Sequence, residues 1–307
     1  LHAFCHAHDV LHAHRGKVIY ATSPAQVEWL EGTFSRSKEW GIEGIEILPR
    51  NRLRAVEPSL NALAGLYFPN EAIVDPGQFV DCVAAQARGR EVEIRLNTLV
   101  RSIKLSPDEV RIATSTGTVR ASHLVNAAGL NAVSIAHSGG VAREITPFHL
   151  PARYHLIKDV KINGTIHPVP DAAHPFLGVH VDRLIHGMIR LGPVLNMTGL
   201  RCSHVKGIVK LARNPTFLKV ALLEIQRVAK SKVSSHELES LIEGYSKTKI
   251  MQTMTALSPQ IIQDNAIAND LLLYRGVASV HCLNLVSPAF TGCFSLARRC
   301  TTILGLT

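Results

Sequence analysis

The sequence predicts a mixed α/β (α+β) fold, in which an α/β sheet is interrupted by an antiparallel one. First, a helix pattern after Asp75 leads through alternating strand patterns to a continuous apolar run at 123–128 that ends in small residues. Second, residues 145–200 carry strand patterns with no helix pattern between them. Third, the chain returns to a strand and a closing helix after residue 277. This order is typical of an α/β domain with an inserted antiparallel sheet.

The helices of the first half begin at recognisable caps. After a strand pattern at 16–21, Ser23 offers an N-cap and Pro24 stands at the first helical position. Gly41 can end that helix, because glycine adopts the left-handed conformation of a helix C-terminus. Asp75 offers the same kind of cap to a second helix. We therefore expect two capped helices before the main run of strands.

The strands that follow lead to a turn of very small residues. Alternating or apolar stretches predict strands at 92–96, 99–105, 110–112, from 119 onward and at 123–128, followed by a helix near 131–137. Ala127, Ala128 and Gly129 end the last of these strands. Their small side chains would let a bulky ligand approach the backbone, although a tight strand-to-helix turn without a ligand is the alternative.

The second half predicts an antiparallel region, helices and a final α/β unit. The expected elements are a strand at 153–158, a hairpin at 177–190 bent near 182–183, helices between 203 and 247, a strand at 277–283 and a helix at 289–304. Ser287 and Pro288 mark the start of the last helix. A helix N-terminus at the end of a strand can bind an anion, or it can simply be capped.

Composition excludes several classes of protein. The 307 residues are 46% hydrophobic and 19% charged, which excludes disorder, and no apolar run reaches the length of a membrane-spanning helix. The formal charge is +9, but the basic residues are scattered and no nucleic-acid motif occurs, so no nucleic-acid partner is expected. The six cysteines include no CxxC pair, which favours free thiols over a zinc site or a disulfide scaffold.

Histidines crowd the first fourteen residues, at positions 2, 6, 8, 12 and 14. Several of them could share one face of a helix and bind a metal ion. No carboxylate or cysteine stands at a familiar metal-ligand spacing from them. We therefore expect a partly exposed helix rich in histidine and assign no metal-binding residue, with a metal or anion site as the weaker alternative.

Several segments, in order, resemble the L-2-hydroxyglutarate dehydrogenases, a family of the D-amino-acid-oxidase-like flavoproteins. The most specific block comprises residues 167–171 (His-Pro-Val-Pro-Asp), 175–180 (Pro-Phe-Leu-Gly-Val-His) and 190–193 (Arg-Leu-Gly-Pro). Further matching segments are 15–19, 55–58, 72–75, 124–130 and 153–157. Together they cover nearly the whole chain.

The resemblance implies a partial FAD-binding Rossmann-like domain interrupted by a substrate domain built on an antiparallel sheet. Residues 1–145 would begin the FAD-binding domain, 146–250 would form the substrate domain, and 251–307 would return to the first. The family oxidises L-2-hydroxyglutarate to 2-oxoglutarate, with a hydride passing from C2 to flavin N5. Electrons then usually pass to a quinone pool or an electron-transfer flavoprotein.

The resemblance also bears on partners and location. It implies a small dicarboxylate as substrate and is compatible with peripheral association with a membrane. It further implies a mitochondrial location in a eukaryote, and a cytoplasmic, membrane-associated one otherwise.

The resemblance and the chemistry of the residues together suggest a site. His180 is the candidate base, because imidazole titrates near neutral pH. Arg153 would bind a substrate carboxylate with its fork of N–H groups, and Tyr154 would donate from its hydroxyl. A structural histidine and a surface arginine are the alternatives for the first two. The implied FAD-binding residues are Val100, Ala127, Ala128, Gly129, Ser287, Pro288, Ala289 and Thr291.

The chain departs from the family pattern in two main ways. No GxGxxG motif, which would hold the FAD pyrophosphate on a helix N-terminus, occurs in the sequence. The arginine that the family carries before its final strand has no counterpart where residues 264–268 run into 271–273. We therefore expect a truncated or degenerate member of the family. The alternative is a non-catalytic descendant that binds dicarboxylates, or serves as a scaffold, without FAD.

Overall fold

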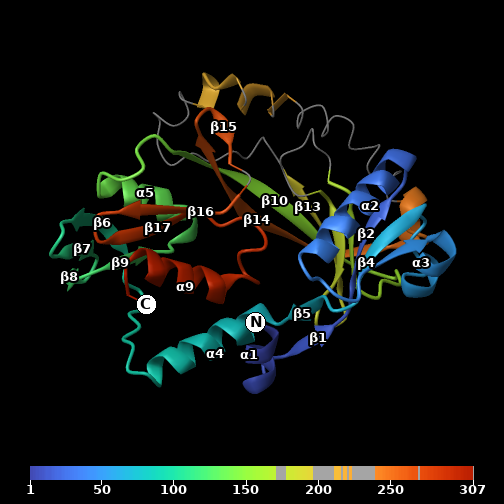
Figure 1. Ribbon diagram of the computed structural model, residues 1–307, viewed down its shortest axis with the longest axis horizontal. Coiled ribbons are helices and arrows are strands. Elements are labelled where there is room, and N and C mark those ends of the chain that lie inside the picture. The colour runs from blue at the N-terminus through green and yellow to red at the C-terminus, as the bar shows by residue number, and fades with distance from the viewer. Residues whose placement is uncertain are drawn as a thin grey trace.

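Two sheets of different character dominate the molecule and confirm the mixed α/β fold (Figure 1). In the nine-stranded sheet the strand order is β15-β14-β10-β13-β12-β11-β2-β4-β3, and every neighbouring pair is antiparallel except β11 and β2. In the three-stranded sheet β16-β17-β9, β17 runs parallel to β9. This computed structural model describes residues 1–170, 178–195, 211–215, 217–219, 221–222, 239–268 and 270–306.

The described elements follow one another along the chain. The helices are α1 (His2–Ala7), α2 (Pro24–Glu39), α3 (Arg50–Val56), α4 (Pro76–Arg88), η1 (Gly129–Asn131), α5 (Ala132–Ser138), η3 (Tyr245–Lys247) and α9 (Cys293–Ile303). The strands of the first half are β1 (His12–His14), β2 (Lys17–Ala21), β3 (Glu46–Pro49), β4 (Ala64–Phe68), β5 (Ala72–Val74), β6 (Val100–Leu105), β7 (Val110–Thr114), β8 (Gly117–Ala121) and β9 (Leu124–Asn126). The later strands are β10 (Thr146–Lys158), β11 (Thr165–Pro168), β12 (His180–Arg183), β13 (Ile189–Leu195), β14 (Lys249–Gln263), β15 (Ala266–Ile267), β16 (Leu272–Gly276) and β17 (Ser279–Asn284).

The nine-stranded sheet takes strands from all three predicted segments of the chain. Strands β2 to β4 come from the first segment, β10 to β13 from the second, and most of β14 from the third. The division at residues 145 and 250 into two domains stays a prediction. The smaller β6-β7-β8 sheet confirms the three strands expected before the small-residue turn.

The N-cap hydrogen bonds of α2 and α4 confirm two predicted helix starts. The Ser23 hydroxyl accepts a hydrogen bond from the Gln26 backbone N–H at 3.4 Å, and an Asp75 carboxylate oxygen accepts one from Gln78 N–H at 3.0 Å. Each bond satisfies a backbone donor that the first turn of a helix leaves without a partner. Gly41 follows α2 with φ of +72°, as expected of a residue just past a helix C-terminus.

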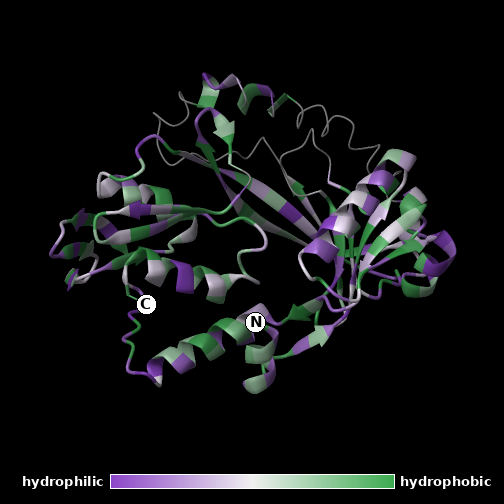
Figure 2. Ribbon diagram, viewed as in Figure 1, coloured by the Kyte–Doolittle hydropathy of each residue, from purple (hydrophilic) through white to green (hydrophobic). Residues whose placement is uncertain are grey.

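Apolar side chains pack against both faces of the nine-stranded sheet, and Figure 2 marks the hydrophobic residues along its strands. On one face, Val18 and Val181 pack with Leu53 of α3. On the other face, Leu66 packs with Leu30 of α2. Because both faces are covered at this end of the sheet, a polar side chain that faces inward there needs a partner within the protein.

Three expectations about local structure were wrong. Residues 92–96 form no strand, since they pair with no strand among the described residues, residue 96 lies in a turn, and Leu96 is 71% exposed. The histidine segment is helical only in α1, since residues 12–14 pair with β5 instead. The hairpin between β12 and β13 bends at 184–188, where Gly187 adopts φ of +86°, rather than at 182–183.

The closing helix begins later than expected, and the helices between 203 and 247 are only partly visible. Residues 288–292 form turns, and α9 starts at Cys293 after Gly292. Phe290 and Phe294 contact Phe79 of α4, with ring centroids 5.2 Å and 5.9 Å apart, so aromatic packing and not Ser287 sets the geometry at this start. Most of 203–238 lies outside the described residues.

A buried carboxylate anchors one end of the nine-stranded sheet. Glu57, which follows α3, is 2% exposed and accepts hydrogen bonds from Gly164 N–H at 2.6 Å and Asn163 N–H at 2.9 Å. Burial raises the pKa of Glu57, and these two backbone bonds oppose that rise. Glu57 therefore fixes the turn before β11, which explains its place in the matching segment 55–58.

We expect Glu57→Ala to lower the free energy of unfolding by about 2–4 kcal/mol, since two buried backbone N–H groups would lose their acceptor. Glu57→Gln keeps one acceptor oxygen and should cost less. Urea denaturation of the two variants and the wild type measures the difference. A loss below about 0.5 kcal/mol for Glu57→Ala would show that the turn does not depend on this carboxylate.

Candidate functional site

An arginine–carboxylate pair lies at the centre of the nine-stranded sheet. Asp182 of β12 is directly opposite Arg190 of β13, so both side chains point to the same face. One carboxylate oxygen of Asp182 accepts from Arg190 Nη2 at 2.6 Å and from Nε at 3.1 Å. The Asp182 side chain is 9% exposed and that of Arg190 is 36% exposed. The guanidinium thus compensates a buried charge and keeps one edge open to solvent.

Two imidazoles adjoin this pair. His180 lies two residues before Asp182 on the same strand, and its Nε2 is 3.4 Å from the Asp182 carboxylate. His167 at the end of β11 stacks on His180 with ring centroids 4.4 Å apart, and its Nε2 is 3.9 Å from the other carboxylate oxygen. His180 Nδ1 lies 3.0 Å from the Gly178 carbonyl, which can only accept, so Nδ1 carries the proton. Nε2 of neutral His180 therefore carries the lone pair, at 3.4 Å from the carboxylate.

Burial keeps both rings neutral. It lowers the pKa of His167 to about 3, with a further contribution from the neighbouring His180. It also lowers the pKa of His180, although Asp182 and the bond to Gly178 oppose that effect. The resting cluster consequently holds one ion pair and two neutral imidazoles, and a proton added to His180 would be stabilised by the adjacent carboxylate.

The structure brings Tyr154 to this cluster but not Arg153. The Arg190 guanidinium lies over the Tyr154 ring, 5.1 Å from its centroid. Burial raises the pKa of Tyr154, so its hydroxyl stays protonated as a donor. Arg153 immediately precedes Tyr154 on the same strand and is exposed; its side chain points to the opposite face of β10. Of the three predicted catalytic residues, His180 and Tyr154 therefore share a face and Arg153 does not.

The cluster also has the composition of a metal site. Ligand atoms of His167, His180 and Asp182 lie within 4.8 Å of one another, although the sequence led us to expect no metal ligand. Arg190, however, already holds one carboxylate oxygen through two N–H groups. A divalent cation would have to bind beside that guanidinium. The charge balance favours proton transfer and anion binding over metal binding.

The predicted cofactor turn lies at the carboxyl end of β9. Ala127, Ala128 and Gly129 are exposed, and a Cβ at Gly129, which has φ of +56°, would meet nothing within 4 Å among the described atoms. Val125, on the strand itself, is 44% exposed. An open turn with almost no side chains fits the approach of a flat, bulky group to the backbone.

A buried network holds this turn in shape. The Asn126 side-chain amide donates to the Ala132 carbonyl at 2.8 Å and contacts Nδ1 of His281 at 3.0 Å, while its oxygen accepts from Ala128 N–H at 3.3 Å. His281 in turn contacts the Ser279 hydroxyl through Nε2 at 3.0 Å. Burial lowers the pKa of His281, which keeps its ring neutral. These hydrogen bonds therefore fix the conformation of the turn before any ligand binds.

The second predicted cofactor segment reaches the same edge of the sheet. Because β17 runs parallel to β9, residues after β17 emerge beside residues after β9. Ser287, Pro288 and Thr291 are exposed there, and Ala289 is half-buried. Val100 is half-exposed at the start of β6, a strand that contacts α5 just after the turn. The described residues fit the flavin end of FAD, whereas the pyrophosphate-binding GxGxxG is absent from the sequence.

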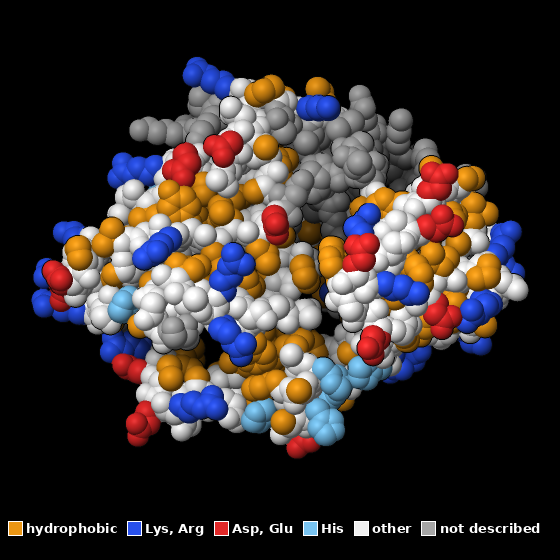
Figure 3. Space-filling view, viewed as in Figure 1, with side chains coloured by type: hydrophobic (Ala, Val, Ile, Leu, Met, Phe, Trp, Pro, Cys, Tyr) orange, Lys and Arg blue, Asp and Glu red, His pale blue; other side chains and the backbone are white. Residues whose placement is uncertain are grey.

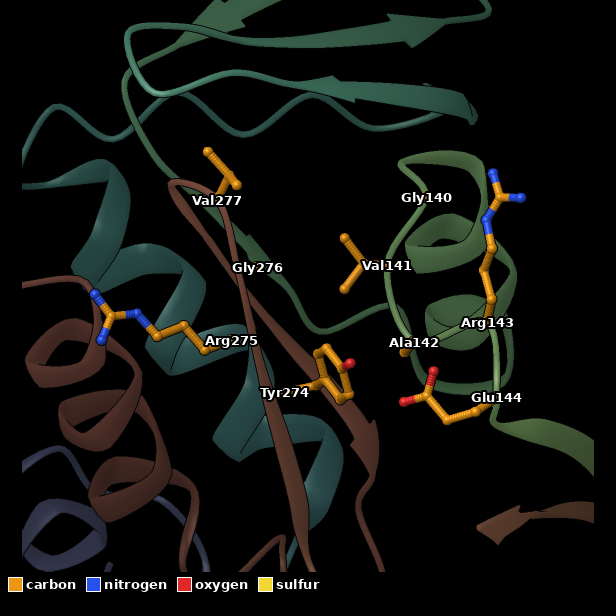
Figure 4. A pocket seen from close by; sticks show the side chains of 9 residues that line it. All are labelled: Gly140, Val141, Ala142, Arg143, Glu144, Tyr274, Arg275, Gly276 and Val277. Atoms are coloured by element: carbon orange, nitrogen blue, oxygen red, sulfur yellow. The ribbon is translucent and has the colours of Figure 1, made fainter. Parts of the chain in front are cut away.

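A surface pocket lies elsewhere in the molecule (Figure 4). It is lined by residues 140–144, which follow α5, and by 274–277 of the β16–β17 hairpin. Glu144 and Tyr274 face each other across it, and their hydrogen bond raises the pKa of the Tyr274 hydroxyl. None of the predicted site residues lines this pocket, so it does not connect the cofactor turn with the His180 cluster.

Sequence reasoning missed three members of the cluster: His167, Asp182 and Arg190. A signal for two of them was present, because residues 180 and 182 alternate on one strand and Arg190 follows on the returning strand of the hairpin. Pairing Asp182 with Arg190 requires the register, which depends on where the turn lies. The contact of His167 depends on strand β11, which lies next to β12 only in the folded sheet.

Comparison with known proteins relates the chain to flavoenzymes. Residues 1–201 match the family model described as FAD dependent oxidoreductase. An L-2-hydroxyglutarate dehydrogenase of Indibacter alkaliphilus is 26% identical over 313 residues, covering 95% of this chain and 78% of that protein. One from Escherichia coli K12 is 32% identical over 199 residues, covering 62% of this chain and 46% of the enzyme.

The fold also resembles that of solved flavoenzymes. An L-α-glycerophosphate oxidase of Mycoplasma pneumoniae with FAD bound aligns with a TM-score of 0.73 over 97% of this chain and 74% of that one, at 19% identity. A glycine oxidase of Bacillus cereus aligns with a TM-score of 0.69 over 98% of this chain and 76% of that one, at 14% identity. At these identities the likeness concerns the fold.

The buried imidazole of His167 should make stability depend on pH. Its folded pKa of about 3 lies below the usual 6.5, so the unfolded chain binds more protons once the pH falls below 6.5. Stability should therefore decrease by about 1–2 kcal/mol from pH 7 to pH 5 on account of this residue. Urea denaturation at both pH values should show a smaller decrease for His167→Gln. The exposed control His8→Gln should behave as wild type; equal decreases in all three proteins would contradict the assignment.

Proposed function

Because this chain belongs to the FAD dependent oxidoreductase family, we propose that it oxidises the 2-hydroxyl group of L-2-hydroxyglutarate to give 2-oxoglutarate. Two relatives named L-2-hydroxyglutarate dehydrogenase support this substrate. The observation that carries the proposal is the buried network of His180, Asp182 and Arg190, which combines a proton acceptor with a carboxylate-binding cation.

The cofactor would be held at the edge where β9 and β17 end. When bound, FAD supplies the acceptor for the hydride that leaves C2 of the hydroxy acid. Residues 127–129 would face the ring with their backbone, and residues 287–291 would border it from the neighbouring strand. Asn126 would hold the first of these turns through its bond to Ala128 N–H.

His180 has the properties of the base that takes the hydroxyl proton. Its ring is neutral at rest because burial lowers its pKa, and its proton sits on Nδ1, which the Gly178 carbonyl fixes. Nε2 is therefore the atom that accepts. Once protonated, Nε2–H would lie 3.4 Å from the Asp182 carboxylate, which stabilises the new positive charge.

Arg190 has the properties of the group that binds a substrate carboxylate. Asp182 takes Nε and Nη2, and no hydrogen bond to a described residue is recorded for the third guanidinium nitrogen, which would bind a second anion. Tyr154, beneath the guanidinium, restricts its movement and can donate from its own hydroxyl. The predicted role of Arg153 in carboxylate binding stays a prediction, since its side chain lies on the opposite face of β10.

The electron acceptor and the location follow the same proposal. A quinone pool or an electron-transfer flavoprotein would take the electrons, and the enzyme would act at a membrane surface or in mitochondria. A mitochondrial location is printed in the name of the relative from Pongo abelii. Among the described helices, none is long and apolar enough to cross a membrane.

The chain purified with added FAD should reduce a dye acceptor with L-2-hydroxyglutarate. The reaction should proceed faster with this substrate than with its D-enantiomer or with L-lactate, which lacks the second carboxylate. Stopped-flow bleaching of the flavin absorbance measures the reductive step directly. Dicarboxylate binding by calorimetry, with no FAD bound and no dye reduction, would instead support the non-catalytic descendant.

Variants of the cluster should separate binding from chemistry. Asp182→Asn removes the counter-charge of protonated His180, so kcat should fall about 100-fold. A lysine cannot pair with Asp182 and also present a second nitrogen to the substrate carboxylate, so Arg190→Lys should raise KM about tenfold. Arg153→Lys provides the direct comparison between the two arginines. A larger KM increase for Arg153→Lys than for Arg190→Lys would move the carboxylate site to the other face of the sheet.

A further inference from the structure

A lysine stands in the same row of the nine-stranded sheet as the Asp182–Arg190 pair. Lys17 of β2 is opposite Thr165 of β11, and Thr165 is opposite Asp182 of β12. Asp182 is in turn opposite Arg190 of β13. Residues that are register partners project from the same face of a sheet. The four side chains therefore leave one face, with a cation at each end of the row and the Asp182 carboxylate between them.

The interval between the two cations suits a ligand with an anionic group at each end. Three strand spacings of about 4.8 Å separate the backbones at Lys17 and Arg190, which gives about 14 Å. Lysine carries its ammonium on a flexible four-carbon stem, so the charge can approach the middle of the row. His180 lies two residues before Asp182 on β12, and its ring borders the row. A diacid that spanned the two cations would pass beside His180.

The charges of both cations act on the imidazoles between them. Burial is the main cause of the lowered pKa of His167, and the neighbouring His180, Lys17 and Arg190 lower it further. Burial is also the main cause for His180, whose pKa Lys17 and Arg190 lower further and Asp182 raises. Figure 3 shows basic and acidic side chains interspersed over one face of the molecule, so the net charge of the chain does not mark a site. Within this row, two cations face one carboxylate, and an anionic ligand would balance them.

Lys17 is not held in a close ion pair. Its Nζ is 3.8 Å from the Glu71 carboxylate, which exceeds the length of a hydrogen bond, and the Glu71 side chain is 51% exposed. Nζ also lies 5.9 Å from the centroid of the Phe68 ring. The Lys17 side chain is only 25% exposed. Because an exposed carboxylate at this distance stabilises the ammonium little, a second anion would add to its stability.

We propose that Lys17 binds the distal carboxylate of the substrate and thereby selects diacids, while Arg190 binds the carboxylate next to the hydroxyl group. The strand order sets this orientation, since His180 on β12 is next to the strand of Arg190 and two strands away from that of Lys17. The inference rests on the proposed function, because it concerns the same site. Arg190 alone would bind any 2-hydroxy acid, whereas Lys17 adds the preference for a second carboxylate.

Binding of acids that cannot be oxidised tests this inference separately from the redox reaction. Calorimetry of the full chain with added FAD compares glutarate with pentanoate, which has the same carbon chain but one carboxylate. The wild type should bind glutarate at least about tenfold more tightly, which corresponds to one partly desolvated ion pair. Lys17→Gln should remove that preference and leave pentanoate binding unchanged, and Lys17→Arg should keep the preference.

Two further variants separate this role from a structural one. Glu71→Gln removes the other charged partner of Lys17, so glutarate should bind at least as tightly as to the wild type. A loss equal to that of Lys17→Gln would show that Lys17 acts through Glu71 and would overturn the inference. Lys104→Gln is the matched control, because Lys104 is exposed on β6, and it should bind both acids as the wild type does. Circular dichroism establishes that each variant is folded.

Failure of this inference differs from failure of the proposed oxidation. If L-2-hydroxyglutarate does not bleach the flavin but glutarate binding depends on Lys17, the oxidation is wrong and the carboxylate site stands. If the wild type binds glutarate no better than pentanoate, or if Lys17→Gln retains the preference, the carboxylate site is wrong whatever the bleaching experiment shows.

Discussion

The carboxylate of Asp182 is the constraint on which the centre of the nine-stranded sheet depends. A charge that is only 9% exposed must be compensated within the protein, and Arg190 on the adjacent strand does so with two N–H groups. That bond places the guanidinium over Tyr154 and leaves His180 facing the same carboxylate. This ion pair therefore brings together His180 as a proton acceptor, the Arg190 cation and the Tyr154 phenol. Without the carboxylate, the guanidinium would lose the two hydrogen bonds that hold it over Tyr154.

The parts of the fold that could be predicted from the sequence are those that depend only on residues close to one another in the chain. Ser23 and Asp75 cap helices because a short polar side chain reaches the next free N–H whatever lies around it. The strand predicted at 92–96 and the predicted start of the closing helix were wrong, because both features depend on contacts with residues far away in the sequence. A strand requires a partner, and the start of α9 is set by contacts of Phe290 and Phe294 with a helix two hundred residues away in the sequence.

The same distinction applies to the site. His180 and Tyr154 became candidates because the family resemblance marks their segments, and residues 127–129 became candidates because their small side chains are evident in the sequence. The partnership of Asp182 with Arg190 was not predictable, because placing the hairpin bend at 182–183 rather than 184–188 changes which residues face each other. Strand alternation turns Arg153 away from Tyr154, and its predicted role in carboxylate binding stays a prediction.

The surroundings of an imidazole decide its chemistry, and two groups of histidines show this. A carbonyl holds Nδ1–H at His180 as it does at His12 and His14, so Nε2 of each neutral ring carries the lone pair. At the sheet centre Nε2 of His180 lies 3.4 Å from a carboxylate whose charge Arg190 already balances, so the neutral ring is suited to accept a proton. On β1 the same atom of His14 instead forms a hydrogen bond with Nε2 of His2, and its lone pair is already satisfied by another imidazole. The carboxylate beside His180, and not the imidazole itself, is therefore what favours acid–base chemistry at the sheet centre.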